Sequence, residues 1–185
     1  KRTRLVSALL TLAMVFTFLP FSAFAEGTGE IPIDKEHFPD YNFRADLYTK
    51  FGTSLSESER NTATDMNLGP NFYGGGRNIE SLKGIEYFTK LEILNCSYNK
   101  ITKLDTNSNS DLEHLICNRN QLTQLIVSGN NALISLSCGD NQLTALDVSG
   151  NLNLTELSCY NNQLTSLDLS HNSKLMSLNC ENNQL

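Results

Sequence analysis

The amino-acid sequence predicts a solenoid built on a parallel β-sheet, and three observations support this prediction. Apolar residues recur every 21 residues from Leu91 onward. Each copy carries the pattern Leu-x-x-Leu-x-Cys-x-x-Asn-x-Leu, with Ile at the last position of the first copy. The remaining residues of each copy show no helical period. Units of this length bury an apolar row only by stacking on their neighbours, so the copies should form one continuous array.

The first 25 residues have the layout of a secretory signal peptide. A basic start precedes an apolar run from Leu5 to about Leu19, Pro20 interrupts the run, and Ala23-Phe24-Ala25 offers a small-x-small cleavage site. We expect cleavage before Glu26 and no membrane insertion afterwards. The alternative is a membrane anchor, because the run is nearly long enough to span a bilayer.

The charge of the chain excludes one class of partner. Three of the 14 Lys and Arg residues and none of the 20 Asp and Glu residues lie in the predicted signal peptide. The rest therefore has 11 basic and 20 acidic residues, a net charge of −9. Such a surface repels phosphate backbones and anionic lipid, so we expect no nucleic-acid partner.

The segment before the repeats divides into a linker and a cap. Residues 26–36 are expected to form an extended linker, and residues 37–65 a small helical N-terminal cap. Asp40 is a suitable N-cap residue for a first helix. Ser56 with Glu59 forms a capping box for a second, shorter one. This unit would shield the first open edge of the solenoid.

Residues 66–90 are expected to form an irregular first repeat. Met66-Asn67-Leu68 is its predicted strand, and residues 71–77, with Gly74-Gly75-Gly76, are expected to form an inserted surface loop. No Lys-Ser or Lys-Thr pair follows these glycines, so a phosphate cradle is not favoured. Apolar residues then return every three positions, at Ile79, Leu82, Ile85, Phe88 and Leu91.

Residues 91–185 form the regular array, which is defined by columns of equivalent residues. The leucine columns are Leu91, Leu112, Leu133, Leu154 and Leu175, and Leu94, Leu115, Leu136, Leu157 and Leu178. The cysteine column is Cys96, Cys117, Cys138, Cys159 and Cys180. The asparagine column is Asn99, Asn120, Asn141, Asn162 and Asn183. These columns match the leucine-rich-repeat signature, with Cys at the third apolar position. Because the chain stops halfway through a repeat, we expect it to be truncated C-terminally.

Each repeat is expected to have a concave and a convex half. The Leu-x-Cys part should form one strand of a concave parallel sheet. The second half, for example Leu143 to Asn151, contains Gly, Asn and Ser, so we expect extended or short β segments on the convex side. We expect the asparagine column to be buried where the chain turns inward, with each amide bonding backbone groups or the next amide.

The five cysteines occupy one inward phase of the repeat. Adjacent rungs would place their Cα atoms about 4.8 Å apart, within disulfide range. However, side chains in register on parallel strands point the same way, and no pairing satisfies five residues. We favour buried free thiols that pack as small hydrophobes. A metal ladder is less favoured, because no His or carboxylate recurs beside the cysteines.

No catalytic constellation is present in the sequence. His37, His114 and His171 fall at different repeat phases and in no zinc-ligand spacing, and there is no Gly-x-Ser-x-Gly motif. The sequence therefore predicts a protein that is not an enzyme and has no cofactor and no metal site.

From about Ile33 onward the chain resembles the leucine-rich-repeat surface proteins of Gram-positive bacteria, in particular the internalins and their cysteine-ladder (internalin J-like) subgroup. The resemblance is carried by the repeat copies, by linkers such as Gln142 to Asp147, and by Phe38-Pro39-Asp40 in the cap. Many relatives carry an acidic EF-hand type loop after the cap helix. Residues 49–54 here contain no Asp, so we expect no calcium site.

The resemblance implies a secreted or cell-surface binding module, similar to an adhesin, that engages an extracellular protein or a mucin-like glycan through its concave face. Two alternatives remain open: a structural spacer that displays another domain, and the binding part of a larger secreted enzyme. The oligomeric state is left open.

The residues between and beside the inward positions should form the concave face. The candidates are Ile93, Asn95, Ser97, His114, Ile116, Asn118, Ser135, Ser137, Gly139, Glu156, Ser158, Tyr160, Ser177, Asn179 and Glu181. Their hydroxyls, amides and occasional apolar groups suit a polar ligand, although an ordinary solvated strand face would look similar. Five rungs give roughly 400 Å², whereas a standard interface needs about 800 Å² per partner. Tight protein binding would therefore need further repeats.

Overall fold

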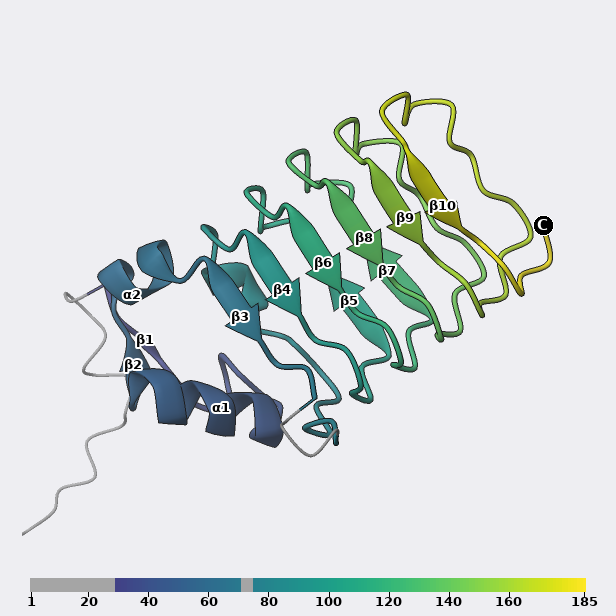
Figure 1. Cartoon of the computed structure of the whole chain (residues 1–185). Helices are drawn as coiled ribbons and strands as arrows, with labels where there is room; N and C mark the ends of the chain where they lie inside the picture. The colour runs from purple at the N-terminus through teal and green to yellow at the C-terminus, as the bar shows by residue number, and fades with distance from the viewer. Residues whose placement is uncertain (1–28, 71–74) are drawn as a thin grey trace, which may run out of the picture.

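The computed structural model describes residues 29–70 and 75–185, which form an elongated solenoid (Figure 1). The predicted signal peptide and residues 71–74 of the predicted loop lie outside the described residues. One face is a six-stranded parallel sheet in the order β10-β9-β8-β6-β4-β3. Its strands are β3 (Asp65–Asn67), β4 (Ile93–Asn95), β6 (His114–Ile116), β8 (Ser135–Ser137), β9 (Glu156–Ser158) and β10 (Ser177–Asn179). The predicted leucine-rich-repeat fold is confirmed.

The register of this sheet follows the 21-residue period. Leu94 lies opposite Leu115, and Leu115 lies opposite Leu136. Because successive side chains of a strand point to opposite faces, the central leucines of β4, β6, β8 and β9 and the cysteines two residues later enter the core. In β10, Leu178 is 44% exposed. Leu94 and Cys96 are both fully buried. The apolar columns thus become continuous rows inside the solenoid.

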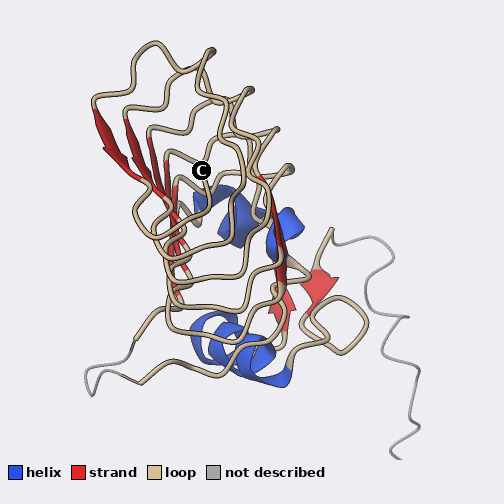
Figure 2. Cartoon of the chain, turned by 90° about the vertical axis from the view of Figure 1, so that its right-hand side faces the viewer, coloured by secondary structure: helices blue, strands red, loops and turns tan. Residues whose placement is uncertain are grey.

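Among the repeats that the structure describes, two have a β-strand on the convex side. Strands β5 (Lys103–Asp105) and β7 (Gln124–Ile126) pair in parallel as a separate two-stranded sheet. The equivalent residues of the later repeats, 145–147 and 166–168, form no strand. Figure 2 shows the coils nearly end on, with β strands on two opposite sides. The expected convex side of extended and short β segments is confirmed.

The cap contains two helices and a small antiparallel sheet. Helix α1 (Tyr41–Phe51) begins after Asp40, whose carboxylate accepts a hydrogen bond from the Phe43 amide at 2.8 Å. Helix α2 (Glu57–Thr62) begins with the expected capping box of Ser56 and Glu59.

The segment expected to be a linker is partly built into the cap. Strand β1 (Ile31–Pro32) pairs with β2 (Ser54–Leu55), and Ile33 is fully buried. The description of residues 26–36 as a linker is therefore wrong for Ile31 to Ile33. The apolar side chains of this stretch pack into the core of the cap. Their burial outweighs the preference of the Gly-rich and Pro-containing local sequence for a linker.

The cap is joined to the first repeats by aromatic packing and by one arginine. Phe38 packs against Tyr87 with ring centroids 5.6 Å apart, and Phe51 packs against Phe88 at 5.9 Å. Arg77 forms an ion pair with Asp46 of α1 and donates to the Asn67 carbonyl of β3 at 3.1 Å. The side chain of Arg77 thus links the cap helix to the first strand of the solenoid.

The asparagine column bonds the backbone of two successive repeats. The Asn141 amide nitrogen donates to the carbonyls of Cys117, Cys138 and Gly139 at 3.0–3.2 Å. Its amide oxygen accepts from the Leu122 N–H at 3.0 Å. The expected burial is confirmed for Asn99, Asn141 and Asn162, which are at most 9% exposed. The other expectation, that stacked amides bond one another, is wrong here, because backbone groups use both ends of each amide.

A second asparagine column lies on the convex side and was not recognised from the sequence. Its members are Asn109, Asn130, Asn151 and Asn172, which are at most 3% exposed. The Asn151 amide nitrogen donates to the carbonyls of Val127 and Asn130, both at 2.9 Å. The amide oxygens of Asn109, Asn151 and Asn172 have no hydrogen-bond partner within the described residues. In the sequence, Leu143 to Asn151 again reads Leu-x-x-Leu-x-apolar-x-x-Asn, and this second copy of the pattern is the signal for the convex column.

Candidate functional site: the concave sheet and its exit edge

The structure places the predicted binding residues on the outer surface of the six-stranded sheet in three columns. The first column is Ile93, His114, Ser135, Glu156 and Ser177, and the second is Asn95, Ile116, Ser137, Ser158 and Asn179. The third is Ser97, Asn118, Gly139, Tyr160 and Glu181, at the ends of the strands. Serine occupies four of the nine positions in the last three rungs, and isoleucines lie in the first two regular rungs.

Ser97 does not belong to an accessible surface. It is only 5% exposed, and its hydroxyl donates to the Asn95 side-chain oxygen at 2.7 Å. The Ser97 amide donates to the same oxygen at 3.1 Å. The chain is already turning at this position, so the Ser97 side chain bonds the Asn95 side chain instead of facing a ligand. The prediction of Ser97 as a binding residue is wrong.

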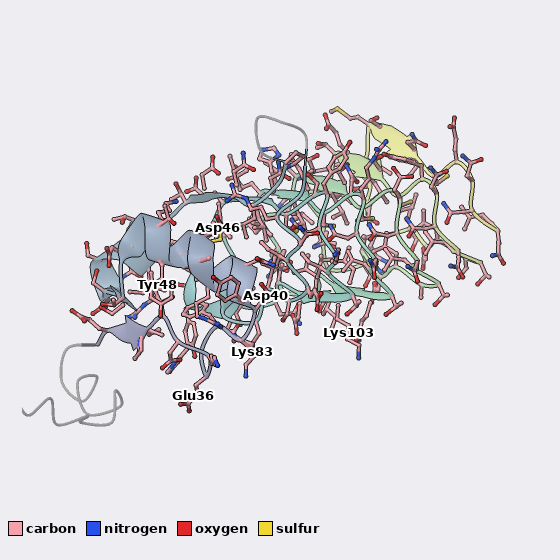
Figure 3. All side chains as sticks on the ribbon, turned by 90° about the horizontal axis from the view of Figure 1, so that it is seen from below. Glu36, Asp40, Asp46, Tyr48, Lys83 and Lys103 are labelled. Carbon is pink, nitrogen blue, oxygen red and sulfur yellow. The ribbon has the colours of Figure 1, made fainter. Side chains whose placement is uncertain are left out.

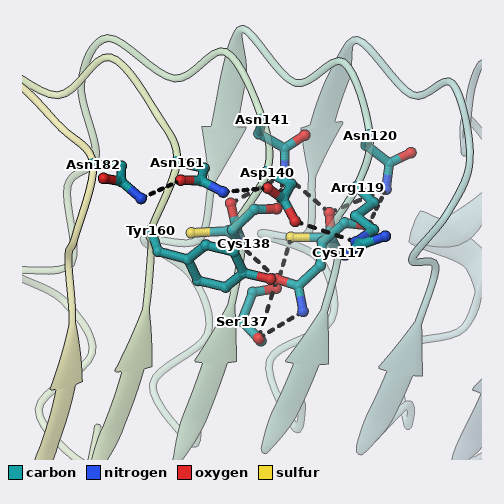
Figure 4. A network of polar contacts seen from close by, with 12 residues as sticks. Cys117, Arg119, Asn120, Ser137, Cys138, Asp140, Asn141, Tyr160, Asn161 and Asn182 are labelled. Atoms are coloured by element: carbon teal, nitrogen blue, oxygen red, sulfur yellow. Dashed lines mark hydrogen bonds and ion pairs between the residues drawn. The ribbon is translucent and has the colours of Figure 1, made fainter.

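The third column contains a packed, hydrogen-bonded cluster around Tyr160. A Cβ atom on Gly139 would lie 2.3 Å from the Tyr160 ring, so the ring lies across the preceding repeat only because residue 139 is glycine. The Gly139 N–H donates to the Asn118 oxygen at 2.7 Å. The Asn118 amide in turn donates to the Ser137 hydroxyl at 2.8 Å. Figure 4 shows this contact network, including Tyr160 and Ser137.

A column of left-handed residues borders this cluster where each strand turns inward. Its members are Tyr98, Arg119, Asp140, Asn161 and Asn182, all with φ between +52° and +58°. Asn and Asp adopt this conformation more readily than other non-glycine residues. An Asn or Asp directly before the asparagine column is therefore the sequence signal for this turn.

The side chains of this exit edge form a polar chain along the solenoid. Arg119 pairs with Asp140 at 3.2 Å, and its guanidinium lies 4.9 Å from the centre of the Tyr98 ring. The Asn161 amide donates to Asp140 at 2.6 Å, and the Asn182 amide donates to Asn161 at 2.7 Å. Burial raises the pKa of the Tyr160 phenol, and the neighbouring Asp140 carboxylate acts in the same direction. Tyr160 is therefore a neutral hydroxyl at physiological pH.

Four of the five cysteines are shielded from solvent beneath this face. Cys96, Cys117, Cys138 and Cys159 are fully buried, and all five cysteines are free. Burial raises the pKa of the Cys96 thiol to about 12 and that of Cys159 to about 11. Because the thiolate is the nucleophile and the metal ligand, buried neutral thiols of this kind are inert. Their role is to fill the core beneath the sheet.

The remaining candidate groups are dispersed. Among residues 29–70 and 75–185, no three His, Cys, Asp or Glu side chains gather in a way that could hold a metal ion. The His37 ring bonds Asp34 in the cap at 2.8 Å, His114 lies in β6, and His171 lies in an exposed turn. Over the same described stretches, no helix has both the length and the apolar character needed to span a bilayer.

Comparison with known proteins gives matches among solved structures. No protein-family model and no curated protein matches the chain. The functional domain of InlJ from Listeria monocytogenes, which includes a cysteine ladder, is 37% identical with a TM-score of 0.72. The match covers 82% of this chain and 33% of the InlJ chain, so this chain spans about a third of the length of that relative.

Two further structures support the architecture. A leucine-rich-repeat protein of Leptospira interrogans is 25% identical with a TM-score of 0.51, and the match covers 54% of this chain and 28% of that one. Internalin C2 of Listeria monocytogenes is 21% identical with a TM-score of 0.53, covering 83% of this chain and 79% of that one, and supports the fold alone. The 21-residue coil, the buried cysteine column and the match to InlJ agree. The chain is an internalin-like leucine-rich-repeat protein.

Proposed function

We propose that this chain is the binding array of an exported or surface-displayed protein of adhesin type, and that it recognises an extracellular protein or a glycan through its concave sheet. The observation that carries this proposal is the cluster in which the Tyr160 ring lies over Gly139. It lies beside the Arg119–Asp140 pair. An aromatic ring, a guanidinium and several hydroxyls gathered on a repeat surface are typical of a recognition site.

The cluster is organised before any ligand arrives. Gly139, Asn118 and Ser137 are already hydrogen-bonded to one another, and Asp140 is held by both Arg119 and Asn161. Fixing side chains in advance reduces the entropy lost on binding, so such a surface binds more tightly than a mobile one of equal area. The acidic remainder of the chain, with 20 Asp and Glu in the sequence, favours neutral or basic partners.

Binding to mucin-coated and glycan-coated surfaces tests this proposal, with Tyr160→Ala as the variant. Removing a central aromatic contact is expected to weaken binding by about tenfold or more. Tyr48→Ala is the matched control, because Tyr48 is 44% exposed on the cap helix, away from the sheet. It should bind like the parent chain. Circular dichroism and thermal melting should show that both variants keep the fold.

Two results would count against the proposal. Equal binding by Tyr160→Ala and the parent chain would remove the cluster from recognition. Failure of the folded parent chain to bind any protein or glycan surface would favour the spacer function. The short hydroxyl side chains of Ser135, Ser158 and Ser177 agree with a spacer.

A further inference from the structure

The Tyr160 side chain presents one open ring face on the concave side of the solenoid. A Cβ atom on Gly139 would lie 2.3–2.6 Å from three atoms of the ring, so the other ring face packs against the backbone of the preceding coil. Gly139 is buried, whereas Tyr160 is partly exposed. The phenol lies near the Asp140 carboxylate and the Arg119 guanidinium, which hold the end of the ring in place. The open face is therefore a fixed aromatic surface (Figure 4).

Hydrogen-bonding groups border this ring and keep part of their capacity. One guanidinium nitrogen of Arg119 pairs with Asp140 at 3.2 Å, and further N–H groups of the guanidinium can donate to a ligand. The Asn161 amide nitrogen donates to Asp140 at 2.6 Å and carries a second N–H group. Ser137 and Ser158 place their hydroxyls side by side on adjacent strands. A ligand whose hydroxyls both donate and accept can use this mixture of groups.

The cluster around Tyr160 is too small for a typical protein interface. It covers the coils of β6, β8 and β9, which span about 10 Å at about 4.8 Å per coil, and a similar length along the strands. The resulting area of about 100 Å² is well below the roughly 800 Å² that a standard interface buries on each partner. The outward residues of β8 and β9 are serines and Glu156, and both residue types are depleted in protein interfaces. Size and composition favour a small ligand that carries hydroxyl groups.

The charges of the cluster disfavour an anionic ligand. Arg119 and Asp140 form an ion pair, so their charges cancel. Glu156 and Glu181 are exposed and form no ion pair with any described residue. Glu181 holds the position of Tyr160 in the next coil, and Glu156 lies four residues before Tyr160 on the same face. Among the described residues of the three outward columns, none is a lysine. Two unpaired carboxylates repel a ligand that carries carboxylate or sulfate groups, so the favoured ligand is uncharged.

We propose that the Tyr160 cluster is a subsite for an uncharged pyranose sugar, which stacks on the open face of the ring. This inference rests on the proposed function and selects a glycan over a protein as the ligand. The aromatic face carries partial negative charge, which attracts the C–H groups on one side of a pyranose. The sugar hydroxyls accept hydrogen bonds from Arg119 and Asn161 and donate to Asp140, at the rim of the ring.

Titration of the ¹⁵N-labelled full chain with methyl β-galactoside and with methyl N-acetyl-β-glucosaminide tests the inference. A single sugar ring makes few contacts, so at least one of these probes should bind with a dissociation constant of about 1–10 mM. In ¹⁵N–¹H spectra it should shift the Gly139, Asp140 and Asn161 amides. The methyl glycoside of N-acetylneuraminic acid, which is anionic, should bind at least about threefold more weakly. Combining Glu156→Gln with Glu181→Gln should remove this difference, because both unpaired carboxylates are then absent.

Two substitutions of Tyr160 separate ring stacking from other contacts. Tyr160→Leu removes the aromatic face and should weaken sugar binding by about tenfold. Tyr160→Phe keeps the ring and loses only the hydroxyl, so its affinity should stay within about threefold of the parent chain. Tyr48→Leu is the matched control, because Tyr48 lies on the cap helix, away from β8 and β9 (Figure 3). It should bind like the parent, and the ¹⁵N–¹H spectrum of each variant shows whether the fold is kept.

The possible failures of this inference differ from those of the proposed function. No shift with either neutral sugar at concentrations up to about 20 mM would overturn the inference. Shifts confined to residues outside the cluster, or equal affinity for the anionic sugar, would overturn it as well. Binding of a protein that depends on Tyr160, without any sugar binding, would overturn it and leave the proposed function intact. Absence of all protein and glycan binding by the folded parent chain would overturn both.

Discussion

At the scale of single residues, Asn141 shows how one side chain completes a repeat. Its amide bonds three carbonyls and one N–H from two successive coils, and it lies where the strand turns inward. No other small side chain offers two donors and an acceptor in that space. Hydrogen bonding therefore determines that this column is asparagine, whereas side-chain volume determines the residues of the leucine columns.

Asn141→Ala is expected to lower the free energy of unfolding by about 1–3 kcal/mol, because it leaves buried backbone groups unpaired. Urea denaturation measures this loss. Asn183→Ala is a suitable comparison: Asn183 makes equivalent bonds to Cys159 and Cys180 but is only partly buried, so water can replace them and the loss should be smaller. Equal and negligible losses in both variants would contradict this account of the column.

At the scale of a repeat element, the hydrogen bonds of the asparagine column on the convex side are incomplete. The Thr106 hydroxyl donates to the Asn130 amide oxygen at 2.6 Å. The residues equivalent to Thr106 in the next two repeats are Val127 and Val148, which offer no donor. The amide oxygens of Asn151 and Asn172 are accordingly buried without a partner. The Thr106 hydroxyl thus separates a repeat whose asparagine is fully hydrogen-bonded from repeats with an unpaired amide oxygen.

Val127→Thr should supply the missing donor to Asn151 and raise the free energy of unfolding by about 1 kcal/mol. Thr106→Val should lower it by about 1–2 kcal/mol, because it leaves the Asn130 oxygen unpaired. Urea midpoints measure both changes, and Thr106→Ser, which keeps the hydroxyl and removes the methyl, should retain the bond to Asn130. If Val127→Thr destabilised the chain as much as Thr106→Val, the unpaired oxygens would not be a source of instability.

At the scale of the whole molecule, the cysteine column links stability to alkaline pH. Burial raises the pKa of Cys96 to about 12 and that of Cys159 to about 11 in the folded chain, whereas an unfolded thiol ionises near 8.5. Between these pH values the unfolded chain binds fewer protons than the folded chain. The free energy of unfolding therefore falls as pH rises from about 9 to 11, by about 1.4 kcal/mol per pH unit for each such thiol.

Denaturant titrations at pH 8, 9 and 10 should reveal this slope. Cys96→Ala removes one buried thiol and should reduce the slope by about 1.4 kcal/mol per pH unit, while lowering the stability at pH 8 through the lost volume. Tyr and Lys also ionise in this range, so the difference between the two chains is the relevant quantity. Identical slopes would mean that the thiols are not protected in the folded state.

Part of the candidate site was predictable and part was not. The alternation of inward and outward residues predicted the members of all three surface columns, because every strand has the same register. It did not identify the burial of Ser97, which depends on a local bond to Asn95. Nor did it predict that Tyr160 would lie over Gly139, since that contact joins two repeats. The period of the sequence determines toward which face each side chain points. Contacts between repeats depend on which residues stack in adjacent coils.

The solenoid, its 21-residue coil, the buried leucine and cysteine columns and the capped helix α1 could all be predicted from the sequence, because each follows from spacing within one short stretch of chain. The way in which the cap and the first repeat meet became visible in the folded chain. Packing of Gly84 against Phe38 diverts one coil and leaves β5 uncovered, and the buried apolar residues at Ile31 to Ile33 turn an expected linker into a strand. These outcomes depend on contacts between segments remote in sequence, where the repeat pattern carries no information.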